Sequence, residues 1–387
     1  MDHKGIFIAS TGQNIGKTTT SLGLLAGLIK RGLKTSFMKP VGQEHITVSS
    51  GEHVDKDVIL MKDYFTLPDP YEQMSPVLIP KGFTKDFIDQ KISSSLLQEK
   101  IEQSYRALCK NNAFMIVEGT GHVGVGSIIQ LNNAQVAKAL DLPVILIASG
   151  GLGSAFDELT LNKTLCDQYQ VKILGVILNR VKVDKIDMIT HYMSKALEQW
   201  NIPLLGCLPF DPFLSTPSMQ DLELLFNTSL LSGEEHRLRH FETIRLVATS
   251  IDVFREMITP NQIILTPANR EEIILAIVSK QLELQHFPSK EDLGAGLILT
   301  GELRPRHFIL EQLQQAHIPM IYTPVHSHVA MEMLTNFTAK IRKEDERKIQ
   351  EAIEVVSSHI DFDHLLELVS CYKNDEKRKI QQKDLLP

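Results

Sequence analysis

The sequence predicts an α/β protein in which a parallel β-sheet is covered by helices on both faces, followed by a second, smaller α/β domain. Short apolar runs without polar alternation recur along the chain with helical stretches between them, which is typical of parallel strands covered on both faces. The first run leads through a glycine-rich loop into an amphipathic stretch. A length of 387 residues suits two domains better than one.

Most strand signals lie in the first half of the chain. Residues 5–10 form the first predicted strand, and the helix after the loop runs from about Thr18 to Lys30 and ends at Gly32, a typical helix stop. Further strands are predicted at residues 34–38, 113–117, 143–148, 173–178 and 204–208. Prolines and turn residues in 210–217 mark a boundary. We therefore expect the first domain to cover residues 1–212.

Strands and helices continue to alternate after this boundary. The sequence predicts strands at residues 263–266, 296–300 and 319–323, and helices at 270–280 and up to residue 316. We expect this second domain to cover residues 213–370. The last residues, 371–387, are charged and poor in apolar side chains, so we expect the tail to be frayed or disordered.

The composition restricts the classes of function. The formal net charge is −7 and the pI is about 6.1, which favours neither a nucleic-acid binder nor a membrane-surface binder. The apolar runs fall short of the roughly 20 residues that a membrane span needs, and the chain start leads into a strand rather than a signal peptide. We expect a cytoplasmic protein that binds neither nucleic acid nor membranes.

The loop after the first strand is close to a phosphate-binding loop with one glycine displaced. Residues 10–19 read Ser-Thr-Gly-Gln-Asn-Ile-Gly-Lys-Thr-Thr, whereas the spacing G-x-x-x-x-G-K-[ST] requires glycine in place of Thr11. A strand that feeds a helix through such a turn directs backbone N–H groups and the positive end of the helix dipole at one point, which suits a phosphate. The residues expected to bind ATP are Gly12, Gln13, Asn14, Ile15, Gly16, Lys17, Thr18 and Thr19.

Lys17 and Thr18 have separate tasks in such a loop. Lys17 adds positive charge toward the β and γ phosphates, and Thr18 offers a hydroxyl ligand to Mg²⁺. The alternative is a chance Gly-Lys-Thr in an ordinary loop, which the predicted strand before it and helix after it disfavour.

The displaced glycine leads to a family resemblance. Residues 10–18 match the variant loop of dethiobiotin synthetase and its relatives in the cobyrinic acid a,c-diamide synthase-like superfamily, so the first domain resembles this class of P-loop NTPase. Three later segments are similar to the same family in the same order: 38–42 (Met-Lys-Pro-Val-Gly), 54–58 (Val-Asp-Lys-Asp-Val) and 116–121 (Ile-Val-Glu-Gly-Thr-Gly). Residues 175–180 (Gly-Val-Ile-Leu-Asn-Arg) resemble the strand whose asparagine reads the adenine edge.

The resemblance implies ligands for Mg²⁺. Asp57 and Glu118 would join the Thr18 hydroxyl, and such hard oxygen ligands suit this ion. Asp57 could instead begin a helix, whereas Glu118, at the end of an apolar strand, would be costly to bury without a role. Asn179 would read adenine, although asparagine also often caps a turn.

Two lysines are candidate catalytic residues. The resemblance implies that Lys39 faces the transferred phosphate and the carboxylate of a substrate. Together with Lys17, it could neutralise charge that builds up on a transferred phosphoryl group.

Three related classes of protein are not expected. Partition and septum-site ATPases carry an additional lysine where this chain has Gly12, so their trans-acting lysine mechanism is unsupported. No cysteine has the glycine-rich elbow of a glutaminase nucleophile. An acetyl-transferring domain would need roughly 300 further residues, so we expect none.

The second half resembles the DRTGG domain over residues 262–276, 296–305 and 318–321. In bacteria that domain follows a dethiobiotin-synthetase-like domain in the amino-terminal part of long phosphotransacetylases, and it also occurs in shorter proteins. Asn269, Glu302 and residues 326–328 (His-Ser-His) depart from the family pattern. A solvated loop is favoured over a metal site at the two histidines, because no third ligand has a suitable spacing.

Two functions remain open. In the first, binding of Mg²⁺ and ATP, with or without slow hydrolysis, is a regulatory or sensory signal that the DRTGG-like domain passes to a protein partner or small effector. In the second, the protein is an ATP-dependent ligase that activates a carboxylate or carbamate by phosphoryl transfer. The additional domain favours the first, as does the presence of Gly42 and Gln43 where true dethiobiotin synthetases have a serine. Relatives of this fold commonly dimerise, so a homodimer is expected.

Overall fold

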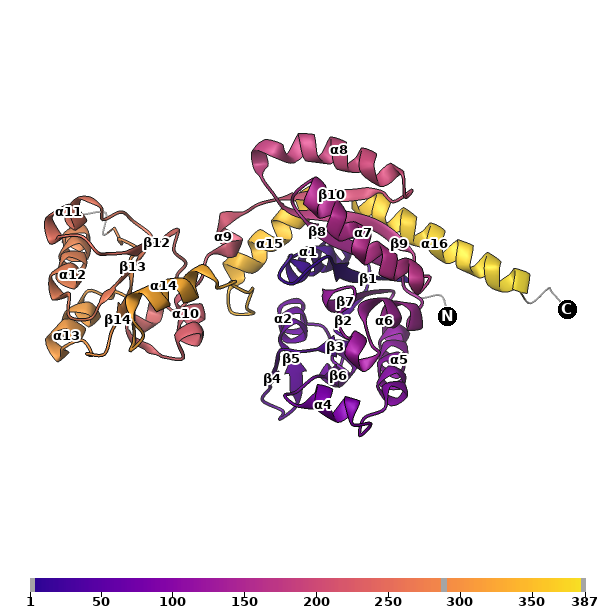
Figure 1. The fold of residues 1–387 in the computed structure, drawn as a ribbon, viewed down its shortest axis with the longest axis horizontal. Helices are drawn as coiled ribbons and strands as arrows, with labels where there is room; N and C mark the ends of the chain where they lie inside the picture. Colours follow the sequence, from indigo (N-terminus) through magenta and orange to yellow (C-terminus); the bar gives the residue numbers. More distant parts are fainter. Residues whose placement is uncertain (1–3, 287–290, 384–387) are drawn as a thin grey trace. The chain divides into compact units, whose positions relative to one another are not determined.

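The computed structural model describes residues 4–286 and 291–383, and the chain forms two compact units. The first unit contains Met1–Phe210 and Ile341–Pro387, and the second contains Asp211–Lys340. Figure 1 follows the chain from indigo through orange to yellow. Each unit has a β-sheet of its own.

A six-stranded parallel sheet forms the centre of the first unit. Its strand order is β10-β9-β8-β1-β7-β2, with every pairing parallel. The strands are Lys4–Ser10 (β1), Thr35–Met38 (β2), Phe114–His122 (β7), Val144–Ser149 (β8), Ile173–Val181 (β9) and Leu204–Pro209 (β10). In β1 the unbroken apolar run at residues 6–9 is fully buried, as expected for a strand covered on both faces. The predicted fold class is confirmed.

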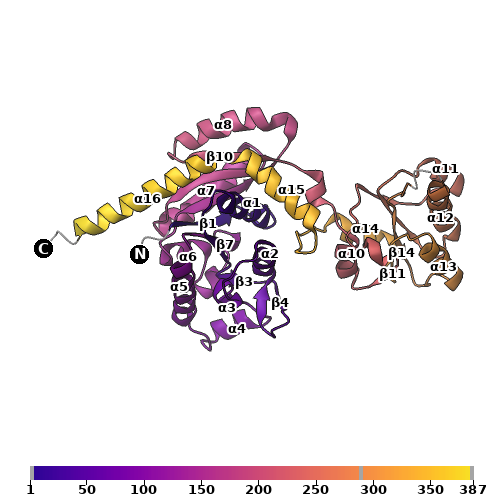
Figure 2. The ribbon, with the colours of Figure 1, turned by 180° about the vertical axis from the view of Figure 1, so that it is seen from behind.

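Helices cover both faces of this sheet, as Figures 1 and 2 show from opposite sides. Because crossovers between parallel strands are right-handed, α1, which leads from β1 past β7 to β2, lies on one face, and the helices that lead back toward β10 lie on the other. These helices are Lys17–Lys30 (α1), Ser94–Asn111 (α5), Asn133–Ala139 (α6), Gly153–Gln168 (α7) and Ile186–Glu198 (α8). Short elements connect β2 to α5: Val41–Gly42 (β3), His45–Thr47 (β4), His53–Asp55 (β5), Lys56–Phe65 (α2), Tyr71–Met74 (α3), Val77–Leu78 (β6) and Phe83–Ile88 (α4).

The second unit is a smaller α/β structure, as predicted. Its strand order is β11-β15-β14-β13-β12; β11 runs antiparallel to β15, and the other pairings are parallel. The strands are Leu230–Ser232 (β11), Thr243–Leu246 (β12), Gln262–Pro267 (β13), Gly296–Thr300 (β14) and Met320–Thr323 (β15). The helices are Pro212–Ser215 (α9), Met219–Phe226 (α10), Ile251–Glu256 (α11), Glu271–His286 (α12), His307–Gln315 (α13) and Ser327–Thr335 (α14). The edge strands β11 and β12 were not among the predicted elements.

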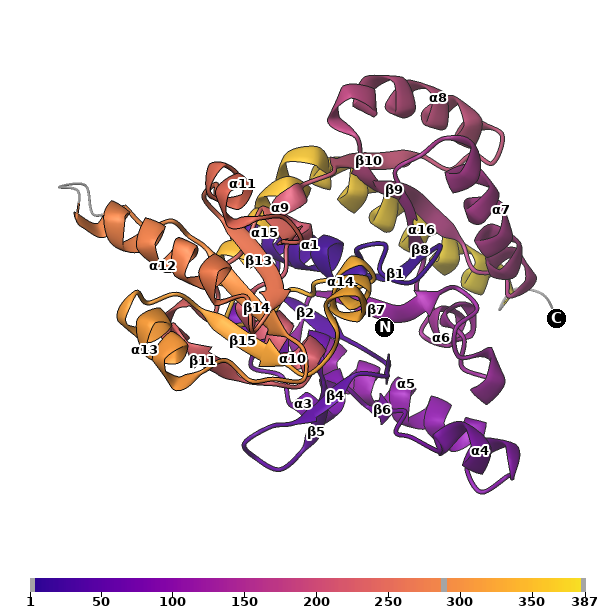
Figure 3. The same cartoon turned by 60° about the vertical axis from the view of Figure 1, so that its left-hand side comes forward.

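The end of the second unit differs from the predicted boundary. The sequence predicts a second domain over residues 213–370, whereas the second unit ends at Lys340. The chain then returns to the first unit through Glu346–His359 (α15) and Phe362–Lys383 (α16), which Figure 3 shows in yellow. α15 packs on α1 and buries Val356 completely. The segment belongs to the first unit because its apolar face is covered there.

The carboxy-terminal tail also differs from the expected frayed segment. It is helical as far as Lys383, and residues 384–387 lie outside the described part of the chain. Tyr372 is buried, with its hydroxyl 3.4 Å from Asp141 Oδ1, and Lys373 Nζ donates to the Asp141 backbone oxygen at 3.0 Å. These contacts order the helix. None of the helices that the structure describes is long and apolar enough to cross a membrane.

Candidate functional site

The loop between β1 and α1 has the shape of an anion-binding turn. Asn14 and Gly16 adopt positive φ angles of 56° and 104°, which turn the chain sharply before α1 begins. α1, all of which the structure describes, has no side-chain cap and no acidic residue in its first turn. Its first N–H groups therefore lack a partner within the helix, and the positive end of its dipole faces the loop, as a phosphate site requires. The remaining predicted loop residues surround the turn: Gln13 is exposed, and Gly12, Ile15 and Thr19 are half-buried.

Lys17 is buried inside this turn. Its Nζ donates to Ser10 Oγ at 2.9 Å and to the backbone oxygen of Gly121 at 3.0 Å. These two oxygens belong to the carboxyl ends of β1 and β7, which are neighbours in the sheet. The structure therefore places the ammonium group beside the loop, where the motif predicts a phosphate-facing lysine.

Three predicted metal ligands converge beside the amino end of α1. Thr18 Oγ1 lies 3.3 Å from Asp57 Oδ1 and 3.5 Å from Glu118 Oε1. Glu118 is fully buried, and within the described residues its Oε2 atom makes no hydrogen bond of regular geometry, although the Ser21 hydroxyl helps to lower the pKa of the carboxyl. An unsatisfied buried carboxylate oxygen is costly. A hydroxyl and two carboxylates, one with an unused oxygen, fit a hard divalent cation such as Mg²⁺.

Lys39 lies on the same two carboxylates. Its Nζ is 2.6 Å from Asp57 Oδ2 and 2.7 Å from Glu118 Oε1, and the side chain is almost completely buried. Burial opposes a charge on Lys39, but the surrounding carboxylates outweigh it and raise the lysine pKa above its usual value. Burial likewise raises the pKa of Glu118 against the lowering effect of Lys39. Lys39 is thus at the predicted site, where it neutralises the predicted metal ligands.

Asp55 has a different task from Asp57. Its Oδ1 accepts a hydrogen bond from the backbone N of Asp57 at 3.0 Å and caps α2. Burial, assisted by the charge of Asp57, raises the pKa of Asp55 to about 7. The sequence favours Asp57 over Asp55 for the site, and the structure brings Asp57 to Thr18 and assigns the helix-capping role to Asp55.

Asn179, at the end of β9, supports the loop. Its Nδ2 donates to the backbone oxygen of Ile15 at 2.7 Å, and its Oδ1 accepts from the backbone N of Arg180 at 2.9 Å. A Cβ at Gly16 would lie 1.9 Å from Asn179 Nδ2, so the loop needs glycine at that position both for its φ angle and for this contact. Adenine reading by Asn179 stays a prediction.

Two family models match the chain. A family model described as an AAA domain matches residues 4–218, which is more than half of the chain. The chain belongs to this AAA domain family. A second model, the DRTGG domain, matches residues 224–337. The protein therefore joins a P-loop AAA domain to a DRTGG domain. This is the domain order that the resemblance to the amino-terminal region of long phosphotransacetylases implies.

The curated relatives that match this chain are longer proteins. The phosphate acetyltransferase of Pseudomonas putida is 28% identical over 92% of this chain and 50% of its own length. The phosphate acetyltransferase of Synechocystis is 24% identical over 93% of this chain and 51% of its own length. The chain thus spans about half the length of the curated relatives it matches.

Solved structures similar to single parts of the chain are more distant. The MinD cell division protein of Aquifex aeolicus is 14% identical over 55% of this chain and 84% of that chain, with a TM-score of 0.34. The CBS and DRTGG domains of the regulatory region of Clostridium perfringens pyrophosphatase, complexed with the activator diadenosine tetraphosphate, are 16% identical over 48% of this chain and 76% of that chain, with a TM-score of 0.26.

Two residues of the AAA domain site are not among the sequence predictions. Ser10 supplies the hydroxyl that accepts from Lys17, and its signal in the sequence is its place as the first residue of the stretch 10–18 that matches the variant loop. Asn133 holds the end of β7: its Nδ2 donates to the backbone oxygens of Thr120 at 2.9 Å and His122 at 2.8 Å. No local motif marks Asn133, because its partners lie on another element.

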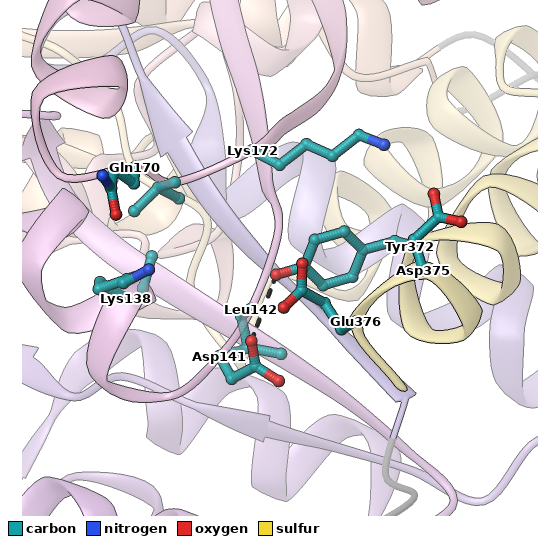
Figure 4. A pocket seen from close by; sticks show the side chains of 10 residues that line it. Lys138, Asp141, Leu142, Gln170, Lys172, Tyr372, Asp375 and Glu376 are labelled. Carbon is teal, nitrogen blue, oxygen red and sulfur yellow. Dashed lines mark hydrogen bonds between the residues drawn. The ribbon is translucent and has the colours of Figure 1, made fainter. Parts of the chain in front are cut away.

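A separate cavity lies at the opposite edge of the AAA domain sheet. It measures about 120 Å³ and is lined by charges of both signs, among them Lys138, Asp141 and Lys172, as Figure 4 shows. Tyr372 and Glu376 of α16 form its other wall. Because these residues lie near the amino ends of β8 and β9, the cavity is distinct from the site at the carboxyl ends of the strands.

Proposed function

We propose that the AAA domain binds ATP together with Mg²⁺ at the amino end of α1, and that the DRTGG domain conveys the nucleotide state as a regulatory or sensory signal. One observation carries this proposal: Thr18, Asp57 and Glu118 converge from separate segments beside an uncapped helix terminus. A purely structural role would leave the buried Oε2 of Glu118 unsatisfied, which costs about 1–3 kcal/mol or more for a charged group.

Each residue has a role in the proposed complex. Backbone N–H groups of residues 12–16 and the Lys17 ammonium group bind the phosphates. Thr18, Asp57 and Glu118 would hold Mg²⁺, which when bound neutralises charge on the phosphate oxygens. Lys39 orients the two carboxylates and adds positive charge beside the phosphates, so Lys17 and Lys39 are the candidate catalytic residues for slow hydrolysis.

A calorimetric titration of the full chain with ATP, with and without Mg²⁺, tests the nucleotide site. We expect Lys17→Ala to weaken binding by about 10- to 100-fold, because the loss of a charge-assisted hydrogen bond costs about 1.5–3 kcal/mol. Lys30→Ala is the matched control, since Lys30 is an exposed lysine in the last turn of the same helix. Unchanged affinity in Lys17→Ala would refute the site.

A second function, ATP-dependent ligation of the dethiobiotin synthetase type, is favoured by the position of Lys39. Thr120 Oγ1 donates to the Val41 backbone oxygen at 2.5 Å and holds the Lys-Pro-Val segment beside β7. A ligase also needs an organic acid as substrate, so phosphate release should be measured with a panel of diamino acids and short carboxylates. Strong stimulation by one compound supports the ligase, and uniformly slow release supports the regulatory function.

The proposal includes the assembly and location of the protein. We place it in the cytoplasm as a homodimer, with a protein or small effector as the partner of the DRTGG domain and with neither nucleic acid nor membrane as a partner. Relatives of this fold commonly dimerise, and the net charge of −7 disfavours binding to nucleic acid. Light scattering after size-exclusion chromatography tests the homodimer, and a monomeric mass would contradict it.

A further inference from the structure

The two chain connections of the second unit leave the first unit from elements that touch each other. The chain enters the second unit after β10 and returns through the segment that leads into α15. β10 and α15 approach so closely that a Cβ at Gly206 would lie 2.4 Å from the backbone oxygen of His359. The second unit, which contains the DRTGG domain, is therefore inserted in the chain between two elements of the first unit that are in direct contact.

The α15–α16 segment packs on the helix that carries Lys17 and Thr18. A Cβ at Gly23 of α1 would lie 2.2 Å from Val356 Cβ, and a Cβ at Gly27 would lie 2.1 Å from Phe362 Cζ. Glycine within a helix costs about 1 kcal/mol relative to alanine, and at these positions it allows the close approach. Such a contact has no space to absorb a small shift of α1, so a shift displaces α15 as well.

The same segment is tied to the helix that carries Asp57. Lys343 Nζ lies 2.8 Å from Asp63 Oδ2, and Gln350 Nε2 donates to the hydroxyl of Tyr64. Asp63 and Tyr64 lie near the end of α2, and Asp57 lies in its first turn. The segment from residue 343 to Phe362 therefore contacts both helices whose amino ends contribute to the candidate Mg²⁺ site.

We propose that α15 is the coupling element that transmits the state of the nucleotide site to the DRTGG domain. This role of α15 rests on the proposed function and identifies the helix through which a change at the nucleotide site would reach the DRTGG domain. Binding of Mg²⁺ and ATP changes the charges around Lys39, Asp57 and Thr18, and α1 and α2 adjust together. α15 contacts both helices. The second unit ends at Lys340, only a few residues before α15 begins. Shifts of about 1–2 Å between packed helices are the usual scale of such switches.

Hydrogen–deuterium exchange of the full chain, with and without Mg²⁺ and ATP, tests this coupling alongside calorimetry. We expect the ligand to slow exchange at least threefold in residues 346–359 and to change it at the two connections, residues 210–217 and 337–345. In the double variant Lys343→Ala/Gln350→Ala, we expect affinity for ATP within threefold of the unaltered protein, because neither side chain belongs to the site. The exchange response of α15 should fall to less than half.

Two further variants complete the test. Val356→Ala loosens the contact with α1 and should also reduce the response. Arg106→Ala removes an exposed ion pair with Glu102 on α5, away from this route, and should leave the response unchanged. If ATP binds but α15 and both connections exchange at the same rates as before, the coupling is refuted while the nucleotide site stands. A full exchange response in the double variant would show that the contacts of Lys343 and Gln350 with α2 do not carry the coupling. Absence of ATP binding would overturn the proposed function itself.

Discussion

Lys39 and Glu118 form a buried ion pair in which Nζ lies 2.7 Å from carboxylate Oε1. The Glu118 side chain is fully buried, and the Lys39 side chain is 6% exposed. Both groups give up hydration, so such a pair adds little net stability, although the loss of one partner alone is expensive. The pair therefore fits the proposed nucleotide site better than a role in stability alone.

Replacing Lys39 by methionine tests how much stability is lost when the two carboxylates have no cation beside them. Lys39→Met keeps the aliphatic stem but leaves Asp57 and Glu118 without their shared cation, so we expect the free energy of unfolding of the first unit to fall by about 3–5 kcal/mol. Urea unfolding followed by tryptophan fluorescence measures it, because the single tryptophan, Trp200, lies in this unit and stacks on Phe156 at 4.3 Å.

A double variant separates charge from packing in this experiment. Lys39→Met/Glu118→Gln removes the buried charge as well, so it should be more stable than Lys39→Met alone. Lys91→Met removes an exposed lysine paired with Asp86 and should leave unfolding unchanged. If the double variant loses the sum of the two single effects, Lys39 and Glu118 are not coupled as described.

Glu118 should determine the magnesium dependence of nucleotide binding. Glu118→Gln keeps the shape of the side chain but removes the charge that attracts a divalent cation, so we expect ATP to bind with nearly the same affinity in the presence and absence of Mg²⁺. Parallel calorimetric titrations with MgCl₂ and with EDTA measure this difference. A variant that responds to Mg²⁺ as the unaltered protein does would remove Glu118 from the site.

The two roles considered for Asn179 can be separated with two nucleotides. Asn179→Ala removes the hydrogen bond to the Ile15 backbone oxygen, so we expect affinity for ATP to fall by about tenfold. If Asn179 also reads the adenine edge, as the family resemblance implies, the variant should in addition lose discrimination between ATP and GTP. Equal weakening of ATP and GTP binding would leave Asn179 only the role of supporting the loop.

The first sheet and much of the site are predictable because the signals are local. The apolar run at residues 6–9 is sufficient to indicate a strand covered on both faces. Carboxyl ends of parallel strands lie at one edge of a sheet, so Glu118, placed by the sequence just after the predicted strand 113–117, is expected near the loop that follows β1. In the structure β7 continues to His122, and Glu118 pairs with Ile8 of β1. Asp57 lies on an inserted segment, and only the family resemblance indicated its position.

The return of the chain to the first unit was not predictable from local patterns. Ile349, Ala352 and Val356 have the spacing of an amphipathic helix, but such spacing does not identify the surface that covers the apolar face. The complementary signal is the pair Gly23 and Gly27, far earlier in the chain, which is informative only once the packed helix is known. Contacts between distant segments, rather than local propensity, decide the position of α15.

Phe362 should be a main contributor to this packing. It is almost fully buried against Gly27, and the Arg31 guanidinium lies 4.4 Å from its ring centre. Truncation of a buried phenylalanine typically costs about 3–5 kcal/mol, so we expect Phe362→Ala to destabilise the first unit by that amount. Leu161→Ala is the control, since Leu161 is 75% exposed. Urea unfolding should separate the variants clearly, and a Phe362→Ala protein as stable as the control would contradict the packing of α16 on α1.

The second unit should lose stability in acid because of Glu223. Burial alone would raise the pKa of this carboxyl, but the hydrogen bonds from Arg237 and the backbone N of Leu230 outweigh it and lower the pKa. A lowered pKa in the folded state gives stability that is present above the unfolded value, about 4.3, and is lost as the pH falls through the folded value. We therefore expect hydrogen-exchange protection of residues 219–232, corrected for intrinsic exchange, to fall below about pH 4. Glu223→Gln should show lower protection at pH 7 and a weaker dependence of protection on pH. The exposed control Glu256→Gln should follow the unaltered protein. If both variants gave the same profile, the ion pair between Glu223 and Arg237 would not be the cause of the acid sensitivity.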